Sequence, residues 1–457
     1  MNQQASAKAI APSISVDVAN DYQGSYKSKL TTPEIAVSRI PKKCNIMVAF
    51  FSGAAPSVLK AIGDRVRAGA YDELRLFYMH PSPAFGDALL QYDLMNIVKP
   101  HPVYVGAYER ALTKRAVADG RKVVYYVPCN FSDCTRLLTE DEHPDVFVLQ
   151  VSPMDRAGYF SFGTTGAYSP ALTRKAEHVI VEVNPQMPRT FGQLLHVSEV
   201  HTIVEGSSPI PEIPLRPVSE LDAKIGQLIL ELVPDRACVQ FGIGGVPTAV
   251  AGMLKNHRDL GVHTELLSDG ILELINAGAV TNRFKKINQY KSVFNIAMGT
   301  QALYRAMHDN PSMECWPSEY VNDPRVIGSN DNVLSVNSFL EADLNGQVNA
   351  EFLAHHQFSA PGGQLDFVRG AAYSKGGVSI LAAHATSTDG RFSRIVPSLS
   401  GPATDPRMET QYIVTEYGAC NLRGKSTPER ALALISIAHP KFQEELLRQA
   451  KTLNLIA

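Results

Sequence analysis

The sequence predicts an α/β protein made of two domains, each with a mostly parallel sheet covered by helices. The first observation is that β-rich runs alternate with helix-like stretches such as residues 107–119. Strands that alternate with helices are typical of parallel sheets with helices on their faces. The clearest β-rich runs are residues 45–51, 122–127, 146–151 and 178–183.

The second observation is a proline-rich passage, SSPIPEIPLRPVSE, at residues 207–220. Its four prolines lack backbone donors and disfavour a helix before them. After this passage the alternation restarts, with a helix at 220–233, a strand at 237–241, a Gly-rich turn, a helix and a strand near 262–266. We therefore predict an N-terminal domain at residues 1–218 and a C-terminal domain at 219–457.

The composition is that of a well-packed soluble protein, with 45% apolar and 19% charged residues. Lys and Arg number 43 against 45 acidic residues, so no net field gathers nucleic acid or anionic lipid. The N-terminus lacks the pattern of a signal peptide, and no run of about 18 apolar residues occurs. We expect a cytoplasmic protein, with neither nucleic acid nor membrane as a partner, that forms a homodimer.

A glycine-rich loop joins a strand to a helix in CVQFGIGGVPTAVAGML, residues 238–254. The segment Gly242, Ile243, Gly244, Gly245 and Val246 lets backbone N–H groups approach an anion or a developing oxyanion. A dinucleotide site is an alternative, because Glu265 follows Gly242 by 23 residues, but Pro247 replaces the third glycine of that fingerprint. A purely structural tight turn is the other alternative.

Two polar residues stand out beyond this loop. Glu265 follows β-like residues in GVHTELLSDG, so its carboxylate would open onto the crevice where α/β sheets bind ligands. Asn322, in SEYVNDPRV, could position a reactive carboxylate. A surface glutamate and an asparagine that caps a turn are the plainer interpretations. The pair Asn345 and Gly346 predicts a hairpin turn.

A second glycine-rich segment, SAPGGQLDFVRGAAYSKGG, spans residues 359–377. Gly362 and Gly363 could present a backbone N–H to a carbonyl oxygen, and Lys375 could meet a phosphate. Ordinary turns explain such loops equally well. The motifs of serine hydrolases, zinc proteases and P-loop proteins are absent, and none of the six cysteines shows C-x-x-C spacing. We predict free thiols, no metal and no permanently bound cofactor.

Taken in order, these segments resemble the acetyl-CoA hydrolase/transferase family, a class I CoA-transferase family, from about Tyr26 onward. The most specific pieces are FGIGGVPTAV, HTELLSDG, MGTQALY, YVNDPRVIGSNDN, EADLNGQV, GGQLDFVRGA, SKGG and VTEYGACNLRGKS. The resemblance implies two open, mostly parallel α/β domains packed face to face, with the active site between them. It also implies that coenzyme A enters as a substrate, carried by an acyl-CoA such as acetyl-CoA or succinyl-CoA.

The resemblance implies roles for particular residues. Glu265 would be the acyl-accepting glutamate, and Asn322 would orient it. Backbone oxyanion donors would come from Gly242–Val246 and from the pair Gly362 and Gly363, while Glu416 would lie near the acid-binding pocket.

The chemistry agrees with this assignment, because a carboxylate nucleophile forms a mixed anhydride as reactive as the thioester substrate. The acid acceptor would be of the 4-hydroxybutyrate or butyrate type, and a dicarboxylate such as itaconate or succinate is the alternative. We expect the loops at 51–54, 130–132 and 162–165 to line the acid pocket. An acyl-CoA hydrolase, an NAD-linked oxidoreductase and a CoA-binding regulatory protein without turnover stay open as other functions.

Overall fold

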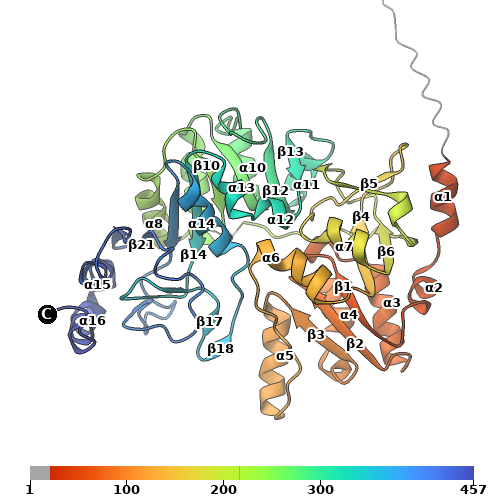
Figure 1. Ribbon diagram of the computed structural model, residues 1–457, viewed down its shortest axis with the longest axis horizontal. Helices are drawn as coiled ribbons and strands as arrows, with labels where there is room; N and C mark the ends of the chain where they lie inside the picture. Colours follow the sequence, from red (N-terminus) through yellow and green to blue (C-terminus); the bar gives the residue numbers. More distant parts are fainter. Residues whose placement is uncertain (1–20, 216) are drawn as a thin grey trace, which may run out of the picture.

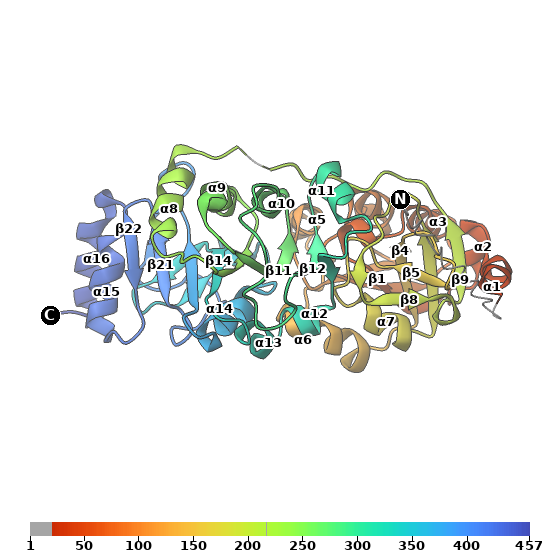
Figure 2. The ribbon, with the colours of Figure 1, turned by 90° about the horizontal axis from the view of Figure 1, so that it is seen from above.

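The computed structural model describes residues 21–215 and 217–457, which fold into two α/β halves lying side by side along the longest axis (Figures 1 and 2). We call the described residues before position 216 the N-terminal half and those after it the C-terminal half. Each half contains one large sheet, and both sheets are mostly parallel. The predicted α/β fold class is confirmed.

The sheet of the N-terminal half consists of six strands that are all parallel to their neighbours. Parallel sheets are covered on both faces, and the six residues of the central strand β4 are all buried apolar or amide side chains. In spatial order the strands are β3 (Val98–Pro102), β2 (Glu73–Tyr78), β1 (Lys43–Val48), β4 (Val146–Val151), β6 (His178–Val183) and β9 (Thr202–Glu205).

Helices cover this sheet, and several of them begin at a residue suited to that position. Thr32 and Ser82 accept hydrogen bonds from backbone N–H groups at the starts of two helices, each with proline in its first turn. The helices of the N-terminal half are α1 (Tyr22–Lys29), α2 (Pro33–Ser38), α3 (Pro56–Arg67), α4 (Pro83–Leu89), α5 (Ala107–Ala118), α6 (Phe131–Arg136) and α7 (Ser169–Lys175).

The sheet of the C-terminal half has nine strands, and only the edge pair β21 and β22 is antiparallel. In spatial order they are β22 (Gly418–Asn421), β21 (Tyr412–Thr415), β19 (Val378–Ala382), β14 (Val333–Ser338), β10 (Cys238–Phe241), β11 (Gly261–Leu267), β12 (Ser292–Ala297), β13 (Met313–Cys315) and β7 (Phe191–Gly192). The chain leaves β10 toward β11 and later returns to its other side as β14. The strand order therefore reverses at β10, and such a point is where open α/β sheets bind ligands.

The helices of the C-terminal half lie on both faces of this sheet, and the last two pack at its β22 end (Figure 2). Ser426 is the N-cap of the first of these two, and Pro440 begins the second. The set is α8 (Glu220–Leu230), α9 (Gly245–Met253), α10 (Asp269–Asn276), α11 (Gln301–Met307), α12 (Ser318–Val321), α13 (Pro324–Gly328), α14 (Gln364–Tyr373), α15 (Thr427–Ser436) and α16 (Pro440–Thr452).

Short elements complete the fold. The predicted hairpin turn at Asn345 and Gly346 joins two antiparallel strands, and Gly346 has a φ of +88°. The short strands are β5 (Tyr159–Ser161), β8 (Leu194–His196), β15 (Glu341–Asp343), β16 (Val348–Asn349), β17 (Phe352–Leu353), β18 (His356–Gln357) and β20 (Ile395–Val396). The short helical turns are η1 (Phe51–Gly53), η2 (Tyr92–Leu94), η3 (Leu137–Asp141), η4 (Val197–Glu199) and η5 (Leu254–Asn256).

One predicted strand, at residues 122–127, is wrong. The segment is extended and runs beside β3, where the N–H groups of Tyr125 and Val127 donate to the carbonyls of Pro100 and Pro102. Proline has no N–H group, so those two positions of β3 cannot return hydrogen bonds and no ladder forms.

The proline-rich passage runs between the two large sheets, and the predicted boundary at residues 218 and 219 falls beside α8. Strand β7 precedes that boundary yet pairs with β13 in the sheet of the C-terminal half. The division into domains at this point stays a prediction.

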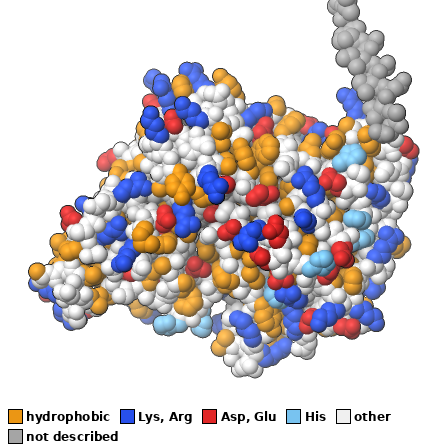
Figure 3. All heavy atoms as spheres, viewed as in Figure 1, with side chains coloured by type: hydrophobic (Ala, Val, Ile, Leu, Met, Phe, Trp, Pro, Cys, Tyr) orange, Lys and Arg blue, Asp and Glu red, His pale blue; other side chains and the backbone are white. Residues whose placement is uncertain are grey.

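The surface carries both signs of charge. Lys and Arg side chains are interspersed with Asp and Glu over the face seen in Figure 3, in keeping with totals of 43 and 45. All six cysteines are free thiols. Within residues 21–215 and 217–457, no helix is long and apolar enough to cross a membrane.

Candidate active site

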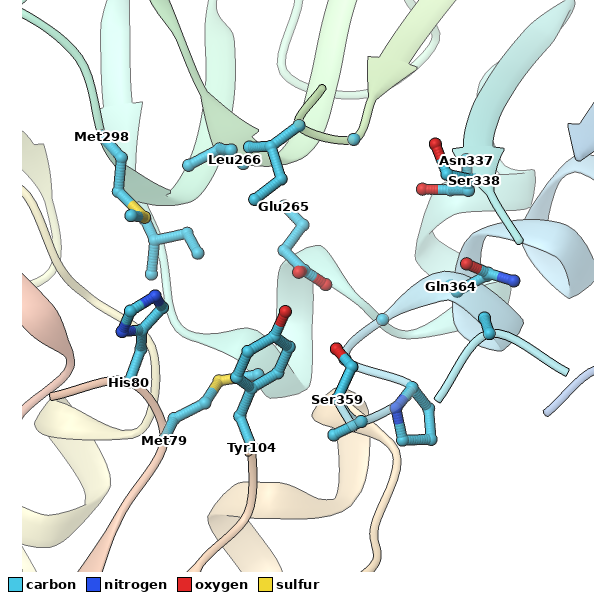
Figure 4. A pocket seen from close by; sticks show the side chains of 18 of the residues that line it. Met79, His80, Tyr104, Glu265, Leu266, Met298, Asn337, Ser338, Ser359 and Gln364 are labelled. Atoms are coloured by element: carbon cyan, nitrogen blue, oxygen red, sulfur yellow. The ribbon is translucent and has the colours of Figure 1, made fainter. Parts of the chain in front are cut away.

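A cavity of about 220 Å³ lies where the strand order of the larger sheet reverses, and residues from both halves line it (Figure 4). Gly242 follows β10, and Asn337 and Ser338 end β14, so the carboxyl ends of these two strands open into the cavity. Glu265 enters from the neighbouring strand β11. The cavity therefore occupies the crevice that the topology predicts.

Glu265 is the carboxylate of this cavity. It is the one residue of β11 that is only partly buried, and its carboxylate points into the space between the halves (Figure 4). Burial, and then the nearby carboxylate of Asp366, raise the pKa of Glu265 to about 7 against the opposing effect of two hydrogen bonds. A group with this pKa is ionised in a large fraction of molecules near neutral pH and is more basic than an ordinary glutamate.

Asn322 provides one of those hydrogen bonds. Its Nδ2 atom donates to Oε2 of Glu265 at 2.7 Å. Asn322 is completely buried at the C-terminal end of α12, directly before α13 begins at Pro324. The structure thus brings together two residues that are 57 positions apart in the sequence.

The other hydrogen bond comes from the backbone N–H of Gly363, the residue before α14. A Cβ atom added at Gly363 would lie 2.0 Å from Oε2 of Glu265 and 2.0 Å from Nδ2 of Asn322. Gly362 has a φ of +56°, in the left-handed region that favours glycine. Glycine is therefore required at 363 by the close approach of two side chains and at 362 by the backbone conformation.

Residues of the N-terminal half hold the glycine pair in place. The N–H of Phe131 donates to the carbonyl of Gly362 at 3.0 Å. Ser132 donates twice to the carboxylate of Asp366, from its N–H at 3.0 Å and from its hydroxyl at 2.7 Å. Burial raises the pKa of Asp366 to about 6. Sequence reasoning gave Asp366 no role, although its place in the first turn of a helix after two glycines was a usable signal.

A second cavity of about 330 Å³ adjoins the first at the start of the loop Gly242–Val246. Gly242 and Ile243 line both cavities, and Gly244, with a φ of +128°, lines the second. Gly245 and Val246 form the first turn of α9. Ile243 is 60% exposed, which leaves an apolar side chain facing solvent between the two cavities.

Two predicted site residues are not brought to this place. Lys375 is exposed and precedes β19, whereas the cavity lies at the carboxyl ends of the strands. Glu416 accepts a hydrogen bond from the N–H of Ala385 at 2.7 Å and lines neither cavity. Neither residue lies at the cavity that holds Glu265, and the phosphate contact by Lys375 and the acid-pocket role of Glu416 stay predictions.

None of the loops expected to line the acid pocket, at 51–54, 130–132 and 162–165, lines this cavity. The N-terminal half does supply one wall, but through Phe50, Met79, His80 and Tyr104. Met79 and His80 follow β2, and Tyr104 follows β3 by two residues. These positions are strand ends as well, and the carboxyl-end rule applied to β2 and β3 would have found them.

His80 and Tyr104 form a stacked pair on that wall, with ring centroids 5.7 Å apart and an angle of 9° between the planes. Nδ1 of His80 lies 3.2 Å from the carbonyl of Pro81, and burial lowers the pKa of the imidazole. In Figure 4 the Tyr104 hydroxyl is directed toward the Glu265 carboxylate.

Among the described residues, one cluster has the composition of a metal site. His143, Asp145 and Glu177 place their ligand atoms within 4.8 Å of one another. They precede β4 and β6 at the amino ends of those strands, and none of them lines either cavity. The cluster has no geometric connection to Glu265.

Comparison with known proteins identifies the class. Residues 16–214 match the acetyl-CoA hydrolase/transferase N-terminal domain, and residues 299–450 match the C-terminal domain of that family. The 4-hydroxybutyrate coenzyme A transferase of Clostridium kluyveri is 39% identical over 94% of this chain and 99% of its own. The succinyl-CoA:cyclohexane-1-carboxylate CoA transferase of Geobacter metallireducens is 44% identical over 72% of this chain and 76% of its own.

Among solved structures, RipA from Yersinia pestis is 47% identical and superposes with a TM-score of 0.93 over 96% of this chain and 100% of its own. The fold, the site and these relatives define an enzyme of the CoA-transferase class. The chain belongs to the acetyl-CoA hydrolase/transferase family.

Proposed function

We propose that this enzyme moves coenzyme A from an acyl-CoA, such as acetyl-CoA or succinyl-CoA, to a small carboxylic acid through a glutamyl-CoA thioester at Glu265. The observation that carries the proposal is the Glu265 carboxylate itself. It lies in a cavity between the two halves and accepts hydrogen bonds from Nδ2 of Asn322 and from the backbone N–H of Gly363. Among the described residues, Glu265 is the only one with a carboxylate that lines this cavity.

The reaction begins when Glu265 attacks the thioester carbonyl, forming a mixed anhydride and expelling CoA thiolate. The thiolate then attacks the glutamyl carbonyl of that anhydride and releases the donor's carboxylate, which leaves the glutamyl-CoA thioester. The acceptor carboxylate attacks this thioester, and CoA thiolate leaves and returns to the acceptor's acyl group. Glu265 is regenerated as a free carboxylate, so the exchange balances without an external oxidant or water.

The two N–H groups that donate to Glu265 suit the middle steps of this reaction. When thiolate attacks the glutamyl carbon, negative charge develops on an oxygen of Glu265, where Asn322 and Gly363 already present N–H groups. One preorganised donor of this kind contributes about 2.7 to 4 kcal/mol to the transition state. The N–H groups of the Gly242 loop would serve the carbonyl of the incoming acyl-CoA.

The acid is of the 4-hydroxybutyrate or butyrate type. The described residues that line the cavity include no Lys or Arg, and its wall near His80 is largely apolar, with Phe50, Met79 and Met298. A second, distal carboxylate would lack a bidentate cationic partner there. A dicarboxylate is the second candidate, favoured by the His80 imidazole and the Tyr104 hydroxyl, which could donate hydrogen bonds to a distal carboxylate.

An exchange assay tests this proposal. Acetyl-CoA or succinyl-CoA is incubated with 4-hydroxybutyrate, butyrate, acetate, succinate or itaconate, and the new acyl-CoA is measured. We expect kcat/KM at least tenfold higher for the four-carbon monocarboxylates than for the dicarboxylates. The reverse order would favour the second candidate, and steady loss of acyl-CoA without any acid would indicate a hydrolase.

A further inference from the structure

A buried asparagine outside the cavity contacts the machinery described above. Asn295 lies on β12, a strand whose six residues are all buried, and none of its side-chain surface reaches solvent. The pairs Thr264 with Phe294 and Leu266 with Ile296 set the register of β11 and β12, so Asn295 lies level with Glu265 on the adjacent strand. Its Nδ2 atom donates to Oδ1 of Asn322 at 2.6 Å.

These hydrogen bonds admit one orientation of each amide. An ionised Glu265 only accepts, so Asn322 must present Nδ2 to it and turn Oδ1 the other way. Oδ1 of Asn322 only accepts as well, so Asn295 must present its own Nδ2. The Oδ1 atom of Asn295 is then left buried without a hydrogen-bond partner among the described residues.

We propose that Asn295 is a positioning residue that fixes the polarity of the Asn322 amide, so that an N–H group and not the oxygen faces Glu265. An orphaned buried oxygen costs stability, and a leucine of similar shape would not carry that cost. A buried strand position that keeps such a residue gives up stability for a directed hydrogen bond. The Asn322 side chain also hydrogen-bonds the Asp366 carboxylate. Without Asn295, Oδ1 of Asn322 loses its donor, and the amide is held only by its contacts with the carboxylates of Glu265 and Asp366.

The backbone of Asn295 is fixed independently of its side chain. Its carbonyl accepts hydrogen bonds from the N–H groups of Gly166 at 2.9 Å and Ala167 at 3.2 Å, both from the N-terminal half. A side-chain substitution leaves these contacts in place. The effect of a variant can therefore be assigned to the lost amide and not to a displaced strand.

The test is Asn295→Leu, and it rests on the proposed glutamyl-CoA intermediate. We expect a melting temperature equal to or above that of wild type and a KM for acyl-CoA within about twofold. The rate of adduct formation on Glu265 should fall by on the order of tenfold to a hundredfold, less than the full loss of a donor. In an Asn322→Ala background, Asn295→Leu should change the rate by less than about twofold, because the amide that it orients is gone.

Asn330 is the matched control. It is also completely buried and also has an unpartnered amide atom, but its Oδ1 accepts from the N–H groups of Lys286 and Ile287, away from both cavities. Asn330→Leu should lower the melting temperature and leave the rate per folded molecule unchanged.

Three results would overturn the inference. The first is adduct formation in Asn295→Leu at more than half the wild-type rate. The second is a loss of rate on adding Asn295→Leu to Asn322→Ala that is as large as the loss on adding it to wild type. Failure of both Asn295→Leu and Asn295→Ala to fold would make Asn295 a structural residue. If wild type itself forms no adduct, the proposed function fails. If wild type forms the adduct and Asn295→Leu forms it equally fast, only the inference about Asn295 fails.

Discussion

The Nδ2 atom of Asn322 lies 2.7 Å from Oε2 of Glu265, and this hydrogen bond joins the end of a short helix to the middle of the larger sheet. It favours the ionised carboxylate, while burial and Asp366 favour the protonated one. The balance leaves a glutamate that is partly ionised near neutral pH and more basic than usual.

The rate of adduct formation should depend on pH through Glu265. Only the ionised carboxylate attacks, and its pKa is raised to about 7, so the rate should rise with pH and reach half its maximum near pH 7. Below pH 6 it should fall about tenfold per unit. In Asn322→Ala the midpoint should move to higher pH, because a hydrogen bond to the charged form is lost. Single-turnover measurements from pH 5 to 9 check both, and a midpoint near 4.5 in wild type would contradict the raised pKa.

The folding stability of a Glu265→Gln variant should differ from wild type in a pH-dependent way. The pKa is raised in the folded state, so the wild-type carboxyl favours folding below about pH 4.5, and this is lost as pH rises through about 7. At pH 8 the variant should be more stable by about 1 to 3 kcal/mol, and the difference should vanish near pH 4. Denaturant unfolding at both pH values measures it. A difference that is constant with pH would show that the glutamate is not strained by burial.

Gly363→Ala should lower kcat by a larger factor than it raises the KM for acyl-CoA. The new Cβ would lie 2.0 Å from both Oε2 of Glu265 and Nδ2 of Asn322, so the oxyanion donor and the nucleophile must separate. We expect kcat to fall by at least about a hundredfold, the effect of one lost donor. Gly252→Ala is the control, since a Cβ at that helical position meets nothing within 4 Å. An unchanged kcat with a raised KM in Gly363→Ala would make the loop a binding element only.

Ile243→Ser should raise the KM for acyl-CoA by about fivefold to fiftyfold with kcat within about threefold. Ile243 is an exposed apolar side chain between two cavities, and covering it with the pantetheine arm would remove that surface from water. Met408→Ser is the control, because Met408 is 77% exposed and lines neither cavity. Equal effects of the two substitutions would place the CoA arm elsewhere.

Much of the fold follows from local sequence patterns. The strands at 146–151 and 178–183 match β4 and β6 residue for residue, because runs rich in valine and other apolar residues are typical of buried parallel strands. The run at 122–127 fails for a reason in another segment. Its neighbour β3 carries prolines at the positions that would complete the ladder, and a strand's pairing partner is not visible in its own residues.

The site was predictable to the same extent. The resemblance placed Glu265, Asn322 and Gly363 together, and the geometry brings them within hydrogen-bonding reach. Asn295 was missed because its partner is 27 residues away, and a single asparagine in an apolar strand carries no local pattern. The sequence could not place Lys375 relative to the cavity, because a lysine beside two glycines looks alike at either end of a strand, and its phosphate contact stays a prediction.

The measurement closest to the central claim is the mass of the protein after incubation with acyl-CoA in the absence of an acceptor acid. We expect a covalent gain equal to CoA less one water, located by peptide mapping on β11 at Glu265. Borohydride should reduce that thioester to an alcohol and inactivate the enzyme permanently, only when acyl-CoA is present, and Glu265→Gln should show neither change. Acyl-CoA consumed steadily by wild type without any added mass, and with no sensitivity to borohydride, would contradict the covalent role of Glu265.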